Sequence, residues 1–151
     1  MKVAIYGQFY HQNSEKYVQQ LLDALEKKNI EVFIEENFLE IIRENEVIKK
    51  EYNQFEVFTQ LDNSYDLFFS IGGDGTALKA MRVAWEKNTS LITIGPGRLG
   101  YLVSSSENLG NILKSWKNED YDVVKRKAII QNNDLSLPAF NEVVIIKNSP
   151  T

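Results

Sequence analysis

The residues of this sequence best suited by type and spacing to chemistry are Gly72-Gly73-Asp74-Gly75-Thr76, here called the glycine turn. Glycines around one carboxylate allow the backbone to approach a phosphate closely, and a following helix N-terminus offers N–H groups to an anion. Because a carboxylate is unfavourable in a simple anion site, Asp74 is predicted to accept or orient the proton of an attacking hydroxyl group. A divalent metal and backbone donors would then stabilise the phosphates. The alternative is a tight strand-to-helix turn in which Asp74 or Thr76 only caps the helix.

A second glycine segment, Gly95-Pro96-Gly97-Arg98-Leu99-Gly100, follows the next apolar run along the chain. The glycine turn itself follows Asp66-Leu67-Phe68-Phe69-Ser70-Ile71, which is nearly all apolar, as expected for a parallel strand buried on both faces. Ligands of open α/β sheets bind outside the carboxyl ends of the strands. Both glycine segments are therefore predicted to lie on one rim of a sheet and to face one cleft.

The elements that would position these segments alternate between β-rich runs and segments with helical spacing, which predicts a parallel sheet covered by helices. Strands are expected at residues 3–6, 30–34, 66–71 and 91–94. Helices are expected from Ser14, from about residue 38, from about residue 77 to 87, and after a possible cap at Ser104-Ser105-Ser106. The polar stretch 43–54 has weak periodicity, so the end of the second helix is left open. The predicted fold is an open, mostly parallel, Rossmann-like sheet with helices on both faces.

The character of the chain changes after about residue 118. Residues 123–131 and 140–147 are β-rich and are separated by the turn-prone Asn132-Asn133-Asp134, so they are predicted to form a hairpin. The basic run Lys125-Arg126-Lys127 is interpreted as the exposed part of the first of these strands. We therefore expect an α/β nucleotide-binding domain over residues 1–118 and the incomplete start of a β-rich domain over residues 119–151.

Composition excludes several classes of protein. The 151 residues are 43% hydrophobic and 25% charged, which is typical of a globular chain and not of a disordered or membrane-embedded one. Disulfides, thiolate zinc sites and cysteine nucleophiles are excluded because there is no cysteine. The net charge of −4 argues against nucleic-acid partners, and the short apolar runs argue against membrane partners. A cytoplasmic location is expected.

Three segments together resemble one enzyme family. The glycine turn resembles the signature shared by NAD kinases, diacylglycerol-type lipid kinases and, more distantly, phosphofructokinases. Gly97-Arg98-Leu99-Gly100-Tyr101-Leu102 resembles the Gly-x-Leu-Gly-Phe-Leu segment of NAD kinases, and Phe140-Asn141-Glu142-Val143-Val144-Ile145 resembles their Asn-Glu strand. The three segments occur in family order, so the resemblance selects NAD kinases among these relatives and covers essentially the whole chain.

The resemblance implies transfer of a phosphoryl group from ATP, or from polyphosphate, to the 2′-hydroxyl of the adenosine ribose of NAD. Asp74 would accept the hydroxyl proton, Lys79 would face phosphate, and Tyr101 would lie near the dinucleotide. Otherwise Lys79 is an ordinary exposed lysine and Tyr101 a core residue. Asn141 and Glu142 would hold the adenosine portion through amide and carboxylate contacts. The implied nucleotide-binding set is Gly72, Gly73, Asp74, Gly75, Thr76, Lys79, Gly97, Tyr101, Asn141 and Glu142. Mg²⁺ is the implied cofactor, and a homo-oligomer is expected for the complete protein.

Two departures from the family pattern bear on activity. Gly95-Pro96 stands where the family has Asn and a variable residue, and the family's later glycine- and serine-rich segment is absent, so the chain alone is expected to be inactive.

Three alternatives stay open: a lipid kinase, a non-catalytic nucleotide-binding module and an NAD-dependent oxidoreductase. The oxidoreductase is suggested by the match of residues 95–100 to G-x-G-x-x-G. That fingerprint should open a helix after the first strand, which this segment does not do.

Overall fold

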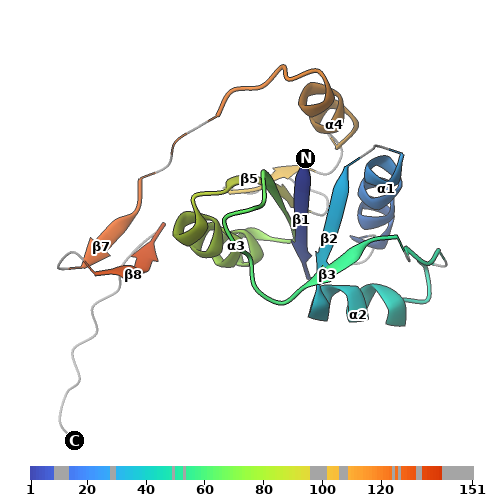
Figure 1. The fold of residues 1–151 in the computed structure, drawn as a ribbon, viewed down its shortest axis with the longest axis horizontal. Helices are drawn as coiled ribbons and strands as arrows, with labels where there is room; N and C mark the ends of the chain where they lie inside the picture. The colour runs from blue at the N-terminus through green and yellow to red at the C-terminus, as the bar shows by residue number, and fades with distance from the viewer. Residues whose placement is uncertain are drawn as a thin grey trace, which may run out of the picture.

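The computed structural model describes residues 1–8, 14–27, 30–48, 50–52, 54–95, 102–105, 109–123, 125, 127–131 and 134–140. Its main body is a six-stranded sheet with the order β3-β2-β1-β4-β5-β6, and all the pairs in it are parallel (Figure 1). The strands are β1 (Lys2–Gly7), β2 (Glu31–Glu35), β3 (Glu56–Phe58), β4 (Leu67–Ile71), β5 (Ser90–Gly95) and β6 (Ser104–Ser105). The predicted open parallel sheet is confirmed.

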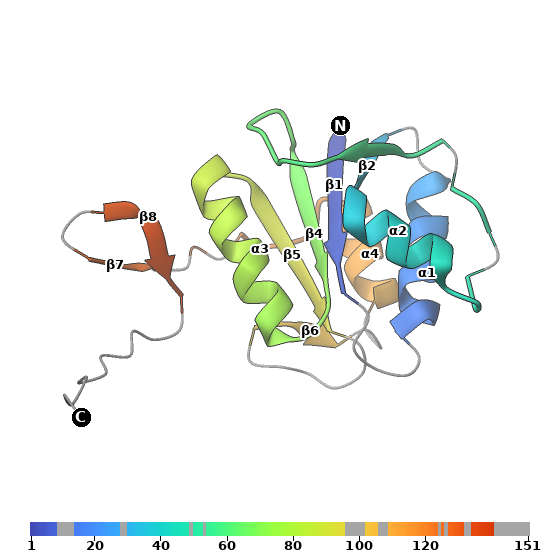
Figure 2. The same ribbon diagram turned by 90° about the horizontal axis from the view of Figure 1, so that it is seen from below.

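Helices cover both faces of this sheet, as predicted. Figure 2 shows α3 (Asp74–Lys87) on one face and α1 (Ser14–Glu26), α2 (Glu36–Glu44) and α4 (Leu109–Lys117) on the other. Every residue of β4 is buried, and neighbouring side chains point to opposite faces. Phe68 packs with Ala80 and Ala84 of α3, whereas Phe69 packs edge to face against Trp116 of α4 at 5.6 Å between ring centroids. Burial on both faces explains why β4 is an uninterrupted apolar run.

The helices follow the apolar spacing of the sequence. In α1, Val18, Leu21, Leu22 and Leu25 are fully buried, and their three- and four-residue spacing places them on one face. The α2 helix begins at Glu36, earlier than the apolar residues near position 38 suggest. It does so because the Glu35 carboxylate accepts a hydrogen bond of 2.9 Å from the backbone N–H of Phe38 and so caps the helix.

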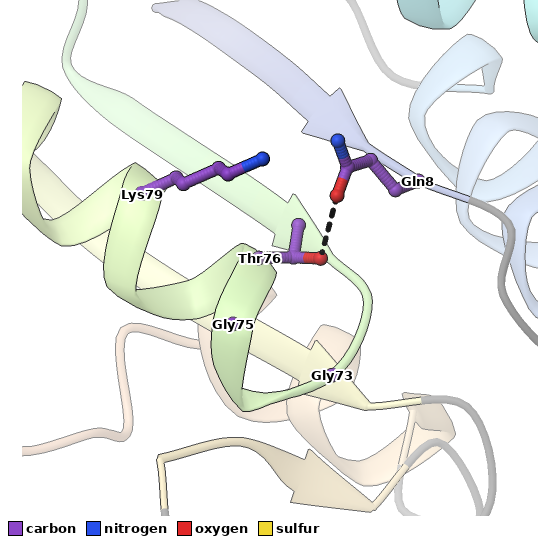
Figure 3. Close-up of a pocket in the computed structure, with 5 residues that line it drawn as sticks. All are labelled: Gln8, Gly73, Gly75, Thr76 and Lys79. Carbon is purple, nitrogen blue, oxygen red and sulfur yellow. Dashed lines mark hydrogen bonds between the residues drawn. The ribbon is translucent and has the colours of Figure 1, made fainter.

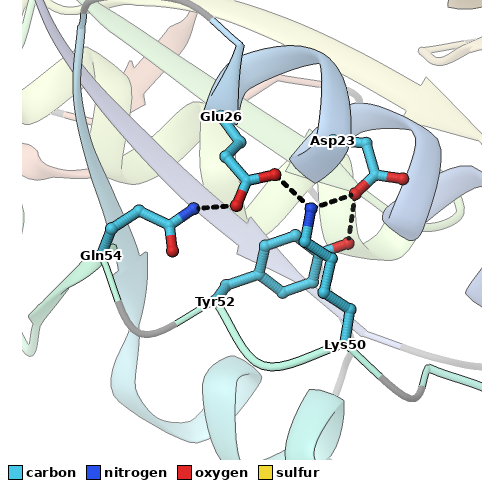
Figure 4. Close-up of polar contacts among 5 residues, drawn as sticks. All are labelled: Asp23, Glu26, Lys50, Tyr52 and Gln54. Atoms are coloured by element: carbon cyan, nitrogen blue, oxygen red, sulfur yellow. Dashed lines mark hydrogen bonds and ion pairs between the residues drawn. The ribbon is translucent and has the colours of Figure 1, made fainter.

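The polar stretch after α2 is held by side chains instead of by regular structure. Tyr52 donates a 3.0 Å hydrogen bond to Asp23 of α1, and Gln54 donates one of 2.5 Å to Glu26 (Figure 4). Lys50 forms ion pairs with both of these carboxylates. These contacts join residues 24 to 29 positions apart, so local periodicity could not reveal them.

Three boundaries differ from the predictions. The strand β3 was not predicted because it is a three-residue edge strand with only Phe58 buried. Ser104 and Ser105 form β6 instead of a helix cap, since they pair with Ile94 and Gly95 at the end of β5. The helix α3 begins at Asp74, before the predicted residue 77, because the connection from β4 is only two residues long.

The C-terminal described residues form a separate antiparallel pair, β7 (Ile129–Gln131) and β8 (Asp134–Ala139). A hairpin is therefore present, but the strand that pairs with β7 is Asp134–Ala139, and not the predicted strand at 140–147, of which residues 141–147 lie outside the described residues. Asp134-Leu135-Ser136-Leu137 alternates polar and apolar residues, which is the strand pattern that was overlooked. Lys125 and Lys127 are exposed, as predicted, but they precede β7 instead of lying in a strand, and Arg126 lies outside the described residues. The division near residue 118 stays a prediction. Among the described helices, none has the length and apolarity needed to cross a membrane.

Candidate functional site

The glycine turn connects β4 directly to α3. Gly72 has φ of 154°, a backbone conformation that favours glycine, and a Cβ added there would lie 2.5 Å from the Thr76 Oγ1 atom. A side chain at position 72 would therefore strain the backbone and clash with the first turn of the helix. Gly72 is required by the fold itself.

Gly73 and Gly75 differ from Gly72 because the position that a Cβ atom would occupy is empty in both. A Cβ added at either position would meet no atom within 4 Å. Both residues line a hollow of about 190 Å³ together with Gln8, Thr76 and Lys79 (Figure 3). No side chain caps α3 at Gly73, so the hollow lies against bare backbone at a helix N-terminus. A phosphate could approach this backbone closely.

Thr76 fixes the turn to the end of β1. Its side chain is buried, and its hydroxyl donates a 3.3 Å hydrogen bond to the Gln8 Oε1 atom. The Gln8 backbone N–H in turn donates to the Ile71 carbonyl at 3.0 Å. The prediction of Thr76 as a possible helix cap is wrong, since its hydroxyl is engaged with Gln8. Sequence reasoning missed Gln8, although its place directly after the first strand puts it on the predicted rim.

Asp74 is the first residue of α3 and does not cap it, because Gly73 occupies the capping position. The Asp74 Oδ1 atom accepts a 3.0 Å hydrogen bond from the backbone N–H of Leu102. A negative side chain in the first turn also interacts favourably with the helix dipole. The capping alternative therefore fails for Asp74, whose carboxylate is instead directed at the segment that returns to the sheet after β5.

Lys79 lies on α3 and borders two hollows. It lines the small hollow and also a larger one of about 430 Å³, which α3 forms with the residues that follow β3. In Figure 3 its ammonium group extends away from α3 toward Gln8. No ion pair among the described residues includes Lys79, so within that part of the chain its charge is available to an anion.

The described part of the chain contains no group of three or more His, Cys, Asp or Glu side chains that could hold a metal alone. Gly97, Tyr101, Asn141 and Glu142, four of the predicted site residues, lie outside the described residues. The structure thus brings together the glycine turn and Lys79, adds Gln8, and leaves the other assignments as predictions.

Comparison with known proteins shows the family to which this chain belongs. Residues 3–121 match the ATP-NAD kinase N-terminal domain. The NAD kinase of Christiangramia forsetii is 40% identical over the whole of this chain and 54% of its own length, and that of Flavobacterium johnsoniae is 35% identical over 52% of its length. Yeast NADH kinase, whose crystal structure contains NADH, shares the fold with a TM-score of 0.62 and 14% identity, over 91% of this chain and 45% of that one. The chain spans about half the length of the curated relatives it matches, and it belongs to the ATP-NAD kinase family.

Proposed function

We propose that the complete protein containing this chain transfers a phosphoryl group from ATP to the 2′-hydroxyl of the adenosine ribose of NAD. The observation that carries the proposal is the position of one carboxylate, Asp74, between Gly73 and Gly75, whose open backbone lines a hollow together with Lys79. Among the described residues, Lys79 forms no ion pair. In a site that only binds an anion, the negative charge of Asp74 would be unfavourable. A phosphoryl-transfer site needs a group that accepts or orients the hydroxyl proton.

Each of the site residues that the structure describes has a role in this proposal. Asp74 accepts or orients the proton of the attacking hydroxyl, while the backbone at Gly73 and Gly75 and the ammonium of Lys79 bind phosphate oxygens. The Thr76–Gln8 hydrogen bond attaches the glycine turn to the end of β1. When bound, Mg²⁺ would neutralise phosphate charge and would be held mainly by phosphate oxygens and water, since the described residues contain no group of three or more acidic or histidine side chains.

The larger hollow favours a nucleoside triphosphate over polyphosphate as the phosphoryl donor. Its walls include Tyr6, Phe58, Leu61 and Phe68, and it shares Lys79 with the small hollow. Nucleotide sites commonly combine an apolar, aromatic wall with a few charged groups. A nucleoside triphosphate would occupy both hollows, with its nucleobase in the larger one and its phosphates at Lys79, whereas polyphosphate has no apolar part to bury.

The test is a completed enzyme in which this chain replaces the matching half of the C. forsetii NAD kinase. NADP formation is measured with NAD, ATP and Mg²⁺. Asp74→Asn should lower kcat by roughly 10²–10⁴, the usual contribution of general acid–base catalysis, and should leave NAD binding intact. Asparagine retains an oxygen that accepts from Leu102, so the loss would report on basicity and not on the loop contact.

The matched control is Glu40→Gln, which removes the same charge from an exposed position on α2. Its rate should stay near that of the parent protein. A near-normal kcat for Asp74→Asn would exclude the catalytic assignment. The chain by itself should form no appreciable NADP, and light scattering of the completed enzyme tests the proposed homo-oligomer. A cytoplasmic location also stays a proposal.

A further inference from the structure

Both backbone polar groups of Leu102 are bound by side chains from other elements. Its N–H donates to Asp74 Oδ1 at 3.0 Å, and its carbonyl oxygen accepts from Thr93 Oγ1 at 2.5 Å. Asp74 opens α3, and Thr93 lies inside β5. Leu102 therefore connects the carboxylate of the proposed active site to the sheet.

Thr93 is the rigid end of this connection. It is paired in register with Ser70 of β4, and the next residue, Ile94, accepts a 2.9 Å hydrogen bond from the Gly72 N–H. Leu102, by contrast, precedes β6, so strand pairing does not hold it. Among the described residues, the two side-chain hydrogen bonds engage both of its backbone polar groups. A change at Thr93 should therefore be transmitted to the Asp74 carboxylate.

We infer that Thr93 is a positioning residue for Asp74: its hydroxyl orients Leu102, whose N–H holds one carboxylate oxygen of Asp74 in place. The inference rests on the proposed function of Asp74 as the group that meets the attacking hydroxyl. Proton transfer requires reacting atoms to be held within a fraction of an ångström, and hydrogen bonds from supporting residues provide that restraint. Thr93 itself need not touch substrate.

Thr93→Val in the completed enzyme tests this inference, because valine keeps the branched shape of threonine and has a methyl group in place of the hydroxyl. We expect kcat to fall about tenfold, less than the roughly 10²-fold that a 1 Å misplacement can cause. KM for NAD should change less than about twofold, since positioning acts on the transition state. Thr93→Ser restores the hydroxyl and should restore kcat.

Thr89→Val is the matched control. Its hydroxyl makes a 3.5 Å contact with the Lys87 carbonyl just before β5, away from the glycine turn. Kinetic constants of this variant should remain near those of the parent. Equal losses in Thr89→Val and Thr93→Val would show a general loss of packing in this region and would overturn the inference.

Two further measurements separate positioning from an unrelated effect. In an Asp74→Asn background, Thr93→Val should cause no further loss, because no basic carboxylate remains to be positioned. Hydrogen exchange at the Leu102 amide should become about tenfold faster in Thr93→Val and not in Thr93→Ser. Unchanged exchange, or a full additional tenfold loss in the Asp74→Asn background, would overturn the inference. If the completed enzyme makes no NADP, the proposed function fails, while amide exchange still reports whether Thr93 orients Leu102.

Discussion

Replacing glycines of the glycine turn with alanine should show which glycine is required for stability and which is required for ligand binding. Gly72→Ala introduces a Cβ at φ of 154° and 2.5 Å from the Thr76 hydroxyl oxygen. A strained backbone conformation costs about 1–3 kcal/mol, and overpacking costs a further ~1–3 kcal/mol. Gly72→Ala should thus lower the free energy of unfolding by about 2–6 kcal/mol, a large part of the ~5–15 kcal/mol typical of a native protein.

Gly75→Ala should have the opposite effect on stability. The added Cβ meets no atom within 4 Å, and alanine is favoured over glycine in a helix by about 0.5–1 kcal/mol. Its stability should equal or exceed that of the parent. NADP formation should nevertheless fall about tenfold or more, because the methyl group enters the hollow where phosphate would approach the backbone.

Urea unfolding midpoints and steady-state kinetics of the completed enzyme check both variants. The expected pattern is a stability loss for Gly72→Ala and an activity loss without a stability loss for Gly75→Ala. Full activity in Gly75→Ala would show that the open side of the turn is not used by a ligand. An unchanged midpoint for Gly72→Ala would refute the strain argument.

Three other changes address the phosphate site, the core and the α1 contacts. Lys79→Met should raise KM for ATP without changing the unfolding midpoint, and an unchanged KM in initial-rate assays would return Lys79 to the class of ordinary surface lysines. Phe69→Ala should destabilise the fold by about 3–5 kcal/mol, because the ring is fully buried against Trp116, and a urea titration measures this. Tyr52→Phe should cost about 0.5–1.5 kcal/mol at neutral pH through the lost bond to Asp23, measured in the same way. The pKa of the Tyr52 hydroxyl is raised first by burial and then by that bond. Its stabilisation of the fold is therefore complete below pH ~10 and is lost as pH rises further. The difference in free energy of unfolding between Tyr52→Phe and the parent should become smaller above pH ~10, and a constant difference would contradict this.

Local patterns in the sequence were sufficient for the central elements. The run at β4 is apolar throughout because the strand is buried on both faces, and α1 repeats its apolar residues because one face packs on the sheet. The glycine turn was predicted as a site since its residue types are unusual and follow β4 directly. In each case the information lies within a few consecutive residues.

Contacts between distant segments were decided only by the tertiary structure. The edge strand β3 and the two-residue β6 are too short to show periodicity, and they exist because β2 and β5 offer free edges for pairing. The Thr76–Gln8 bond joins residues 68 positions apart, and the Asp74–Leu102 bond joins residues 28 apart. Sequence spacing therefore predicted that Asp74 could do chemistry. Only the packing of α3 against the end of β5 determined that Asp74 binds Leu102 instead of capping its own helix, because a hydrogen bond across 28 residues depends on where the chain returns.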